Sequence, residues 1–444
     1  MSAAATDVIP LVQQCIRNAC VNDERPESGQ EIRSADLLRG YLEGPGLDLQ
    51  TYEPIAGRTS LVARIEGTDP SAPSLLLMGH TDVVPVNPAG WSRDPYGGEL
   101  VDGEIWGRGA LDMLHLTCSM AVATRRLADQ GWRPRGTLVY LAVADEEAMG
   151  TWGAEWLVEH ALDDVRADYV ITESGGIVRR GQDGAPRISV SPAEKGPHWC
   201  SILVTGTPGH GSMPYATDNA LVRAAVVVGR IAAYHPPTRV DEYWRRTVDG
   251  FGLPEDERAW LLDPDTLDAS LSALPPGVAK WAHACTHTTF SPNMISGGTK
   301  INVIPDSVEV QVDIRTLPGD GEAEVRAMLA EALGELYNAV RIEFRCVEGA
   351  TASPMDTPAW AAMERAAARA YPGATLAPSM MVGATDARFF RRAGMTAYGF
   401  GLYSDALDLE KYRNMFHGND ERIDTRSLLL ATQLWEDLGV DLLG

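Results

Sequence analysis

Residues 75–85 read LLLMGHTDVVP, and this stretch decides the fold class. Its first four residues are all apolar, which is typical of a strand buried on both faces of a parallel sheet. The runs Leu138–Val143 and Tyr169–Ile171 have the same character. Between such runs lie helical segments such as Asp112–Asp129, where apolar residues recur at helical spacing. This alternation predicts an α/β domain with a doubly wound, mostly parallel sheet.

Strands later in the chain differ, because apolar and polar residues alternate in them. Residues 308–315 (VEVQVDIR) and 341–346 (RIEFRC) each have one apolar and one polar face. That pattern is typical of an antiparallel sheet covered on a single side. Helical patterns at Thr217–Tyr234 and Gly321–Asn338 flank these strands. The repeated order of strand, helix and strand predicts a small ferredoxin-like α+β domain.

The chain is long enough for more than one domain, because 444 residues exceed the usual ceiling for a single hydrophobic core. Helical patterns return after the alternating strands, beginning with a helix that Thr357 caps. We therefore expect an α/β domain formed by residues 1–193 and 351–444, interrupted by a second domain at 194–350. Residues from about 235 to 290 are rich in Pro and Asp, have weak periodicity and look like an insertion.

Composition and charge disfavour several classes of protein. Lys and Arg number 38 and Asp and Glu 61, so the net charge of −23 argues against nucleic acid and acidic membrane surfaces as partners. Apolar runs stay shorter than the roughly 18 residues that a membrane span requires. Residues 1–10 have neither the cationic start nor the apolar segment of a secretory signal. The six scattered cysteines contain no CxxC pair, so we expect reduced thiols and a cytoplasmic location.

Side chains that can bind a metal ion follow each of the three early apolar runs. His80 and Asp82 come after the first run, Glu146 and Glu147 after the second, and Glu173 after the third. In open α/β sheets, functional residues gather just beyond the carboxyl ends of the strands. We therefore expect these side chains to meet in one crevice.

Two further candidates lie elsewhere: Asp112 opens a helix after a Gly-rich turn, and His417 lies in a polar loop. Imidazole together with carboxylate suits Zn²⁺. Two histidines and four carboxylates exceed one tetrahedral site, which favours two metal ions that share a bridging carboxylate. Asp82 could accept the far ring N–H of His80 and fix its tautomer. The adjacent glutamates cannot both point the same way, which favours one metal ligand and one metal-free general base.

Six motifs occur in the same order as in a known family: GHTDVVP, GRGALDM, ADEE, ITESGG, GTPGHGSMP and HGNDERI. Together they resemble the co-catalytic zinc metallopeptidase family of aminoacylase-1, acetylornithine deacetylase, succinyl-diaminopimelate desuccinylase and carboxypeptidase G. The form GHGSMP and the insertion are most similar to carboxypeptidase S-like members. Many members have Lys-Gly where Leu114 and His115 stand here. Neither position is a metal ligand, so this departure concerns the surroundings of the ligands.

The resemblance implies a role for each candidate residue. One zinc would be bound by His80, Asp112 and Glu173, and the other by Asp112, Glu147 and His417. Glu146 would be the general base, and Asp82 would orient His80. In dimeric members the residue matching His210 reaches the partner subunit's site and helps to hold the developing oxyanion. The positions that match residues binding the substrate carboxylate, the last of them more weakly, are Asn302, Arg315 and Arg388.

The predicted function is hydrolysis of the amide bond of an N-acyl-amino acid, or of the C-terminal bond of a short peptide. The resemblance implies two zinc ions, with cobalt or manganese as substitutes, and a homodimer formed through a lid and dimerisation domain at 194–350. The nearest alternative is a small-acyl biosynthetic deacylase of the acetylornithine deacetylase or succinyl-diaminopimelate desuccinylase type. A remote alternative is a non-catalytic, metal-dependent binding protein, which the intact acid and base residues disfavour.

Overall fold

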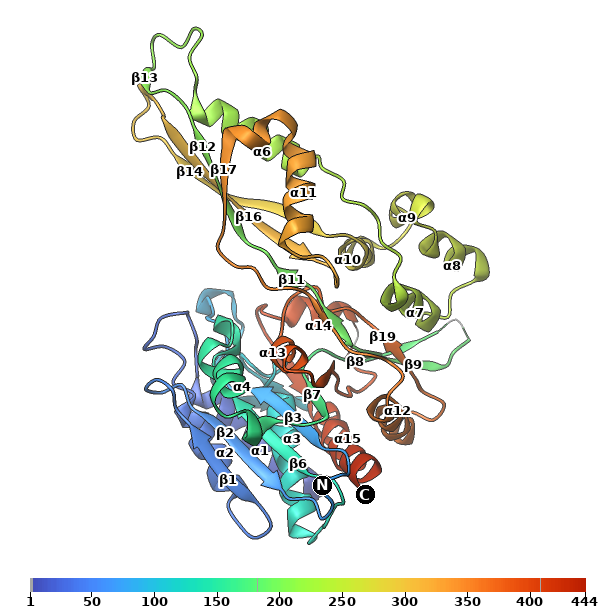
Figure 1. The fold of residues 1–444 in the computed structure, drawn as a ribbon. Coiled ribbons are helices and arrows are strands. Elements are labelled where there is room, and N and C mark those ends of the chain that lie inside the picture. The colour runs from blue at the N-terminus through green and yellow to red at the C-terminus, as the bar shows by residue number, and fades with distance from the viewer. Residues whose placement is uncertain (1–2, 182, 408) are drawn as a thin grey trace.

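A six-stranded sheet forms the centre of one end of the molecule in the computed structural model, which describes residues 3–181, 183–407 and 409–444 (Figure 1). The strand order is β1 (Asp48–Tyr52), β2 (Ser60–Ile65), β6 (Leu138–Val143), β3 (Leu75–His80), β7 (Tyr169–Thr172) and β20 (Thr396–Gly399). The last four strands in this order run parallel, whereas β2 is antiparallel to both of its neighbours. The predicted doubly wound, mostly parallel sheet is therefore confirmed.

Helices cover both faces of this sheet, which explains why its central strands are continuously apolar. Leu75 and Leu77 of β3 pack into the core on one face, where the helices are α1 (Ala3–Asn18), α2 (Ile32–Leu42), α3 (Leu114–Asp129), α12 (Pro358–Ala370) and α15 (Thr425–Leu443). Leu76 and Met78 pack on the other face, against α4 (Trp156–His160), α5 (Leu162–Val165) and α13 (Ala387–Arg392). Alternate side chains of one strand thus enter different cores.

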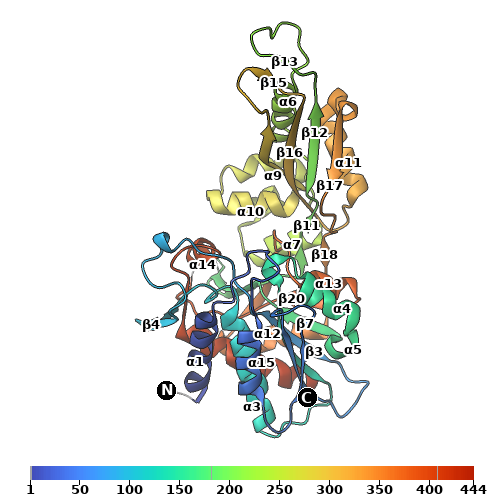
Figure 2. The same cartoon turned by 90° about the vertical axis from the view of Figure 1, so that its left-hand side faces the viewer.

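The second domain projects from this end and is built on an antiparallel sheet (Figure 2). Its strand order is β17 (Val340–Phe344), β12 (Cys200–Thr205), β16 (Ser307–Thr316) and β14 (Thr289–Gly297). The alternating apolar residues of β16 face α6 (Ala220–Ala232) and α11 (Glu322–Leu333) in one core. In chain order this is strand 4, 1, 3, 2, the arrangement of a ferredoxin-like unit. A short strand, β11 (Gly196–Pro197), extends the sheet beside β16.

The chain enters and leaves the second domain through two adjacent segments. β10 (Ala193–Glu194) pairs antiparallel with β18 (Thr351–Ala352), next to the predicted domain boundaries. Beyond this pair lies a three-stranded sheet of β19 (Thr375–Pro378), β9 (Pro186–Val190) and β8 (Gly175–Arg180). A second small sheet joins β21 (Arg422–Asp424), β5 (Glu104–Trp106) and β4 (Glu99–Val101).

The weakly periodic insertion folds into four short helices, α7 (Glu242–Gly250), α8 (Glu255–Leu262), α9 (Pro264–Leu271) and α10 (Pro276–Thr286). Its Asp and Pro residues mark helix starts: Asp241 and Asp263 accept hydrogen bonds from the first turns of α7 and α9. Pro264 and Pro276 occupy first helical positions. Eight to eleven residues per helix are too few to display a clear period, which explains the weak pattern.

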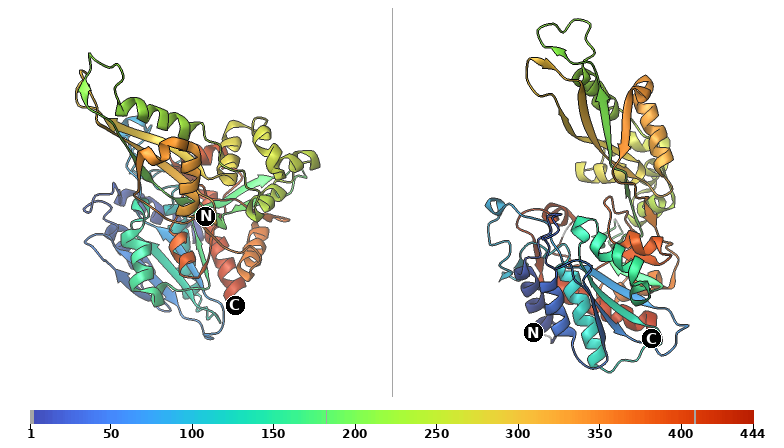
Figure 3. Two further views of the ribbon diagram at one scale, coloured as in Figure 1. Left: turned by 45° about the horizontal axis from the view of Figure 1, so that its top comes forward. Right: turned by 60° about the vertical axis from the view of Figure 1, so that its left-hand side comes forward.

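Two other features concern the second domain's far end and the chemistry of the chain. The antiparallel strand pair of β13 (Gly209–His210) and β15 (Val303–Ile304), which are far apart in the chain, lies at the end of the projection farthest from the central sheet (Figures 1, 2 and 3). All six cysteines are free. Among the described residues, no helix combines the length and apolar character that crossing a bilayer demands.

Candidate metal centre

The carboxyl ends of three adjacent strands supply the first groups of the site. His80 is the last residue of β3, whose parallel neighbours are β6 and β7. Glu146 and Glu147 form a 3₁₀ turn shortly after β6, and Glu173 follows β7 directly. Because parallel strands end at the same edge, the backbone brings these side chains together. His80 and Glu173 are both buried.

Two groups of potential metal ligands share Asp112. Ligand atoms of His80, Asp112 and Glu173 all lie within 4.8 Å of one another, as do those of Asp112, Glu147 and His417. Asp112 Oδ1 is 3.2 Å from His80 Nε2, and its Oδ2 is 2.9 Å from His417 Nε2. His417 Nε2 is also 3.3 Å from a carboxylate oxygen of Glu147. The two oxygens of Asp112 therefore face two different sites, as a bridging carboxylate requires.

His80 is oriented by a main-chain oxygen as well as by a carboxylate. Its Nδ1 donates to the carbonyl oxygen of Asp82 at 2.9 Å, whereas the Asp82 carboxylate is 3.5 Å away. The proton on Nδ1 leaves Nε2 free to bind a cation on the side of Asp112. Asp82 was expected to fix this tautomer with its side chain, and the shorter contact comes from its backbone.

Burial of several carboxylates side by side disturbs their proton affinities. Burial, together with the neighbouring charges of Glu147 and Asp112, raises the pKa of Glu146 to about 8. Burial and Asp112 raise the pKa of Glu147 to about 7. The pKa of Glu173 lies well above its ordinary value because of burial and the nearby Glu146. Hydrogen bonds to Asp112 and Glu147 raise the pKa of His417 to about 10.

The site fits a pair of cations because its negative charge is not balanced by protein groups. Oδ1 of Asp82 and Oε1 of Glu147 are buried without any hydrogen-bond partner. A buried oxygen of this kind is unfavourable unless a proton or a cation satisfies it. Mixed imidazole and carboxylate ligands suit Zn²⁺ and related transition-metal ions.

Glu421 holds the loop that presents Asp112. Its carboxylate accepts hydrogen bonds from the main-chain N–H groups of Gly109 (3.1 Å), Leu111 (2.6 Å) and Asp112 (2.9 Å). Arg108 completes the arrangement with a buried ion pair of 2.6 Å to Glu421. Glu421 lies within the motif HGNDERI, four residues after His417, but its partners are more than 300 positions away. Spacing along the chain could not have revealed this role.

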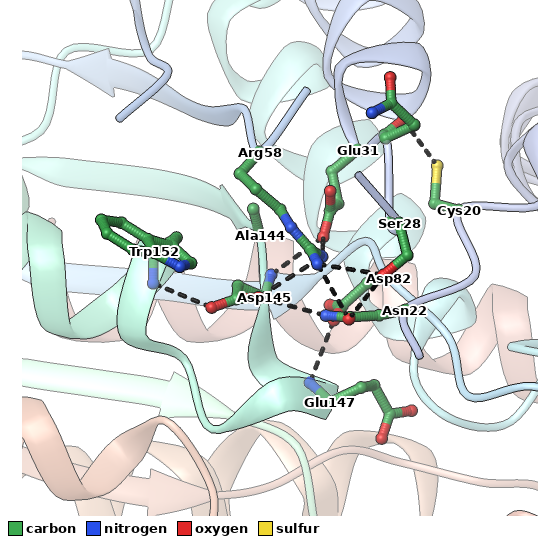
Figure 4. Close-up of polar contacts among 12 residues, drawn as sticks. Cys20, Asn22, Ser28, Glu31, Arg58, Asp82, Ala144, Asp145, Glu147 and Trp152 are labelled. Carbon is green, nitrogen blue, oxygen red and sulfur yellow. Dashed lines mark hydrogen bonds and ion pairs between the residues drawn. The ribbon is translucent and has the colours of Figure 1, made fainter. Parts of the chain in front are cut away.

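A second network supports the site from behind, as Figure 4 shows. Arg58 and Glu31 form an almost completely buried ion pair of 2.7 Å. Arg58 also donates to the side-chain oxygen Oδ1 of Asn22 at 3.0 Å, and the side-chain nitrogen Nδ2 of Asn22 donates to the Asp82 carboxylate at 2.9 Å. Asp82 in turn accepts from the main-chain N–H of Glu147 at 3.1 Å. These contacts connect the segment that follows His80 with the turn that carries Glu147. No sequence motif pointed to Asn22, Glu31 or Arg58.

The segment GATDARFF contributes two further buried side chains. Asp386 has both carboxylate oxygens buried without a partner, and burial and the charge of Glu146 raise its pKa well above the ordinary value. Arg388 donates to Glu348 at 2.7 Å, and its other nitrogens donate to the carbonyls of Thr385 and Met149, also at 2.7 Å. Arg388 thus connects Met149, in the turn after Glu147, with Glu348, near the end of the second domain. Its predicted contact with substrate stays a prediction.

The remaining predicted residues lie in the second domain, away from the ligand groups. His210 belongs to β13 at the far end of the projection, and it accepts a hydrogen bond from Ser212 at 2.8 Å through Nδ1 (Figure 2). Asn302 lies in the adjoining turn, where its carbonyl accepts from Gly211 at 2.8 Å. Arg315 is near the other end of the sheet, pairs with Asp313 at 2.8 Å and stacks over Trp199. One chain alone therefore does not bring His210 and Asn302 to the ligand groups.

Comparison with known proteins gives a consistent result. A model described as Peptidase family M20/M25/M40 matches residues 76–439. Aminoacylase-1 from Sus scrofa is 28% identical over 437 residues, covering 97% of this chain and 94% of that protein. The M20 family metallo-carboxypeptidase of Sulfolobus solfataricus has the same fold, with a TM-score of 0.69, 18% identity and coverage of 100% and 99% of the two chains. An M20 dinuclear metal-binding peptidase of Bacillus subtilis has a TM-score of 0.63 at 15% identity, with coverage of 100% and 99%.

Proposed function

The chain belongs to peptidase family M20/M25/M40 and is a metallo-amidohydrolase or metallopeptidase, and from this premise we propose that it hydrolyses N-acyl-amino acids with two metal ions. The observation that carries the proposal is the position of Asp112 between two ligand groups, one with His80 and Glu173 and one with Glu147 and His417. Relatives that bear the name aminoacylase-1 align with almost the whole chain and support this choice of substrate. Imidazole and carboxylate ligands favour zinc, and cobalt or manganese would fit the same donors.

Held by the two ligand groups, two divalent cations would lower the pKa of a bound water and polarise the scissile carbonyl. Glu146 is the proposed general base, because it is buried beside the ligand groups. Bound cations would favour its ionised form, and the carboxylate would then take a proton from the attacking water. The same carboxyl then returns the proton to the leaving amine. His80 is held by its hydrogen bond to the Asp82 carbonyl, and both His80 and Glu173 are buried, so these groups reorganise little during the reaction.

A homodimer would complete the site. The outer face of α6 exposes Val222 (63%) and Val226 (44%), and the neighbouring strand β14 exposes Met294 (62%) and Ile295 (52%). Among the described strands, β14 pairs only with β16, which leaves its other edge open. An open edge beside an apolar face favours pairing with a second copy. In such a dimer the β13–β15 strand pair would carry His210 to the partner's metal centre.

The substrate's free carboxylate is assigned to the second domain in this proposal. Asn302 directly precedes β15, the strand that pairs with β13 and His210, so the two residues would reach the partner's site together. Arg315 offers a guanidinium that is partly exposed and suited to a carboxylate. Domain closure would be needed to bring Arg315 to the ligand groups. The lid role of residues 194–350 and a cytoplasmic location stay predictions.

Replacing Glu146 tests the proposal most directly. We expect Glu146→Gln to lower kcat on N-acetyl-methionine by about 10²–10⁴-fold, because general base catalysis supplies that much. Bound metal, measured by mass spectrometry of the purified protein, should be unchanged, because Glu146 belongs to neither ligand group. Glu159→Gln on the exposed side of α4 is the matched control and should keep full activity. Undiminished turnover by Glu146→Gln would remove the assigned base.

A substrate panel separates this proposal from its alternatives. N-acyl-amino acids with acetyl, succinyl, aromatic and long-chain acyl groups should be compared with dipeptides. A strong preference for N-acetylornithine or N-succinyl-diaminopimelate would favour the small-acyl biosynthetic deacylase. No hydrolysis of any amide would favour a metal-dependent binding protein.

A further inference from the structure

A pocket beside the ligand groups extends beneath the insertion. Its inner part, of about 280 Å³, is lined by Ser174 and Phe416, which adjoin Glu173 and His417 in sequence. Its outer part, of about 300 Å³, reaches helices α7, α8 and α10. These helices, β8 and α14 (Leu409–Met415) gather on one side of the molecule (Figure 1). The two parts lie side by side, because both are lined by Arg179, Ser189, Trp281 and Ser379.

Most of the pocket wall is apolar. Trp244, Phe251 and Leu261 of the insertion line the outer part, and Ile177 and Met380 line the inner part. Ligand pockets commonly combine such a wall with a few polar groups that fix orientation. An alkyl chain would fill this space favourably, because its methylene groups would leave water for an apolar surrounding.

Four arginines line the pocket: Arg180 is exposed and Arg187 pairs with Asp183, which leaves Arg179 and Arg413. Arg179 of β8 lines both parts of the pocket, and its Nε is buried without a hydrogen-bond partner. Burial and the nearby charge of Arg413 lower the pKa of Arg179 to about 10. Arg413 of α14 lines the inner part, and burial lowers its pKa as well. Among the described residues, neither guanidinium forms an ion pair with a carboxylate.

Arginines whose side chains are almost completely buried form ion pairs, whereas Arg179 and Arg413 are half-buried and form none among the described residues. Arg58, Arg108 and Arg391 form ion pairs of 2.7, 2.6 and 2.9 Å with Glu31, Glu421 and Glu194. Arginine is rarely buried without a partner, because removing its charge from water is unfavourable. In the part of the chain that the structure describes, no carboxylate balances Arg179 and Arg413 beside the metal-ligand residues, so an anion that enters the pocket would find two unpaired guanidinium groups.

We propose that this pocket binds an apolar chain of the substrate that ends in a carboxylate, with Arg179 and Arg413 holding that carboxylate. This inference rests on the proposed amide hydrolysis, which places the scissile bond at the ligand groups beside the pocket. The chain could belong to the acyl group or to the amino-acid side chain, since both flank the scissile bond. In either case the enzyme would prefer a dicarboxylic substrate over its alkyl counterpart of equal length.

The test compares substrates that differ only in the terminal carboxylate. N-suberoyl-leucine and N-octanoyl-leucine probe the acyl side, and N-acetyl-2-aminosuberate and N-acetyl-2-aminooctanoate probe the side chain. We expect kcat/KM to be at least about tenfold higher for the carboxylate-bearing member of one pair, because charge-assisted hydrogen bonds are strong. The pair that shows the preference identifies which part of the substrate enters the pocket.

Arginine variants link the preference to the pocket. Arg179→Met and Arg413→Met should each lower kcat/KM for the carboxylate-bearing substrate and so abolish the preference. Arg341→Met, at an exposed position on β17 in the second domain, should keep the preference. Equal rates within both pairs for the wild-type protein, or an unchanged preference in both arginine variants with native circular dichroism spectra, would overturn the proposal.

A binding measurement separates failure of this inference from failure of the proposed function. Calorimetric titration of full-length Glu146→Gln protein with the same two pairs of compounds needs no turnover. Tighter binding of a carboxylate-bearing compound, lost in the double variant with Arg179→Met, supports the pocket even if no amide is hydrolysed. Equal affinity for both members of each pair would contradict the pocket even if N-acetyl-amino acids are hydrolysed rapidly.

Discussion

The metal-ligand groups and the β13–β15 strand pair differ in what holds their residues in place. Asp112 and His80 are buried, and neighbouring carboxylates and main-chain groups fix them within a few ångströms. His210 lies at the opposite end of the molecule, on a two-residue strand that pairs, among the described strands, only with β15 (Figure 3). The first region is complete within one chain, whereas the second has a chemical use only against another surface. Residues of one active site can therefore depend on very different parts of a fold.

Among the changes that bear on this comparison, the largest expected effect tests whether the β13–β15 strand pair belongs to the same site as the metal ligands. We expect His210→Ala to lower kcat by about 10²–10³-fold, as loss of one oxyanion donor does. Mixing this variant with Glu146→Gln, each nearly inactive alone, should restore activity in hybrid dimers that contain one intact site. Activity of the mixture after subunit exchange is the measurement. Exchange without any recovery would show that His210 does not act across subunits.

A smaller effect is expected when the support of Asp112 is weakened without removing a ligand. In Glu421→Gln, the new amide N–H₂ must face main-chain N–H groups that Glu421 now accepts from. We expect metal affinity to fall about 10–100-fold, the range found for groups that orient metal ligands. Competition with a chelator measures the affinity. Glu104→Gln, which removes a half-exposed partner of Arg422, is the control and should leave the affinity unchanged.

The smallest effect concerns protons released on metal binding. In the metal-free protein, the pKa of Glu147 is raised to about 7, first by burial, so this ligand still holds its proton at pH 6. The proton must leave before the carboxylate binds a cation, and metal affinity should therefore rise between pH 6 and 8. Each ligand that still holds a proton adds up to about tenfold per pH unit below its pKa, and His417, with its pKa raised to about 10, must lose a proton as well. Calorimetry in buffers of different ionisation enthalpy measures the release.

The same titration sharpens the contrast between the two regions. On metal binding, the His210→Ala variant should release the same number of protons as the wild-type protein, because the β13–β15 strand pair lies far from the ligands in its own chain. A changed number of protons in that variant would mean that the strand pair and the metal centre are coupled and are not separate regions.

Much of the fold could be predicted because burial leaves a local pattern. β6 has the predicted bounds, and β3 extends two residues beyond the predicted run, to His80. α3 begins at Leu114, two residues after the predicted start, because Met113 has a non-helical backbone. The four helices of the insertion were not predicted, since each is too short to show a period and its Pro and Asp residues also suit loops.

The sequence by itself determined which residues end the buried strands, and therefore that His80 and Glu173 would meet at one edge of the sheet. It could do so because strand periodicity and strand ends are local properties that a parallel sheet converts into proximity. Only the tertiary structure decided that Glu421 supports Asp112, that Arg179 and Arg413 share a pocket, and that His210 lies far from its own chain's ligands. Those relations depend on how segments distant in sequence pack together, and no local pattern of charge or hydrophobicity encodes them.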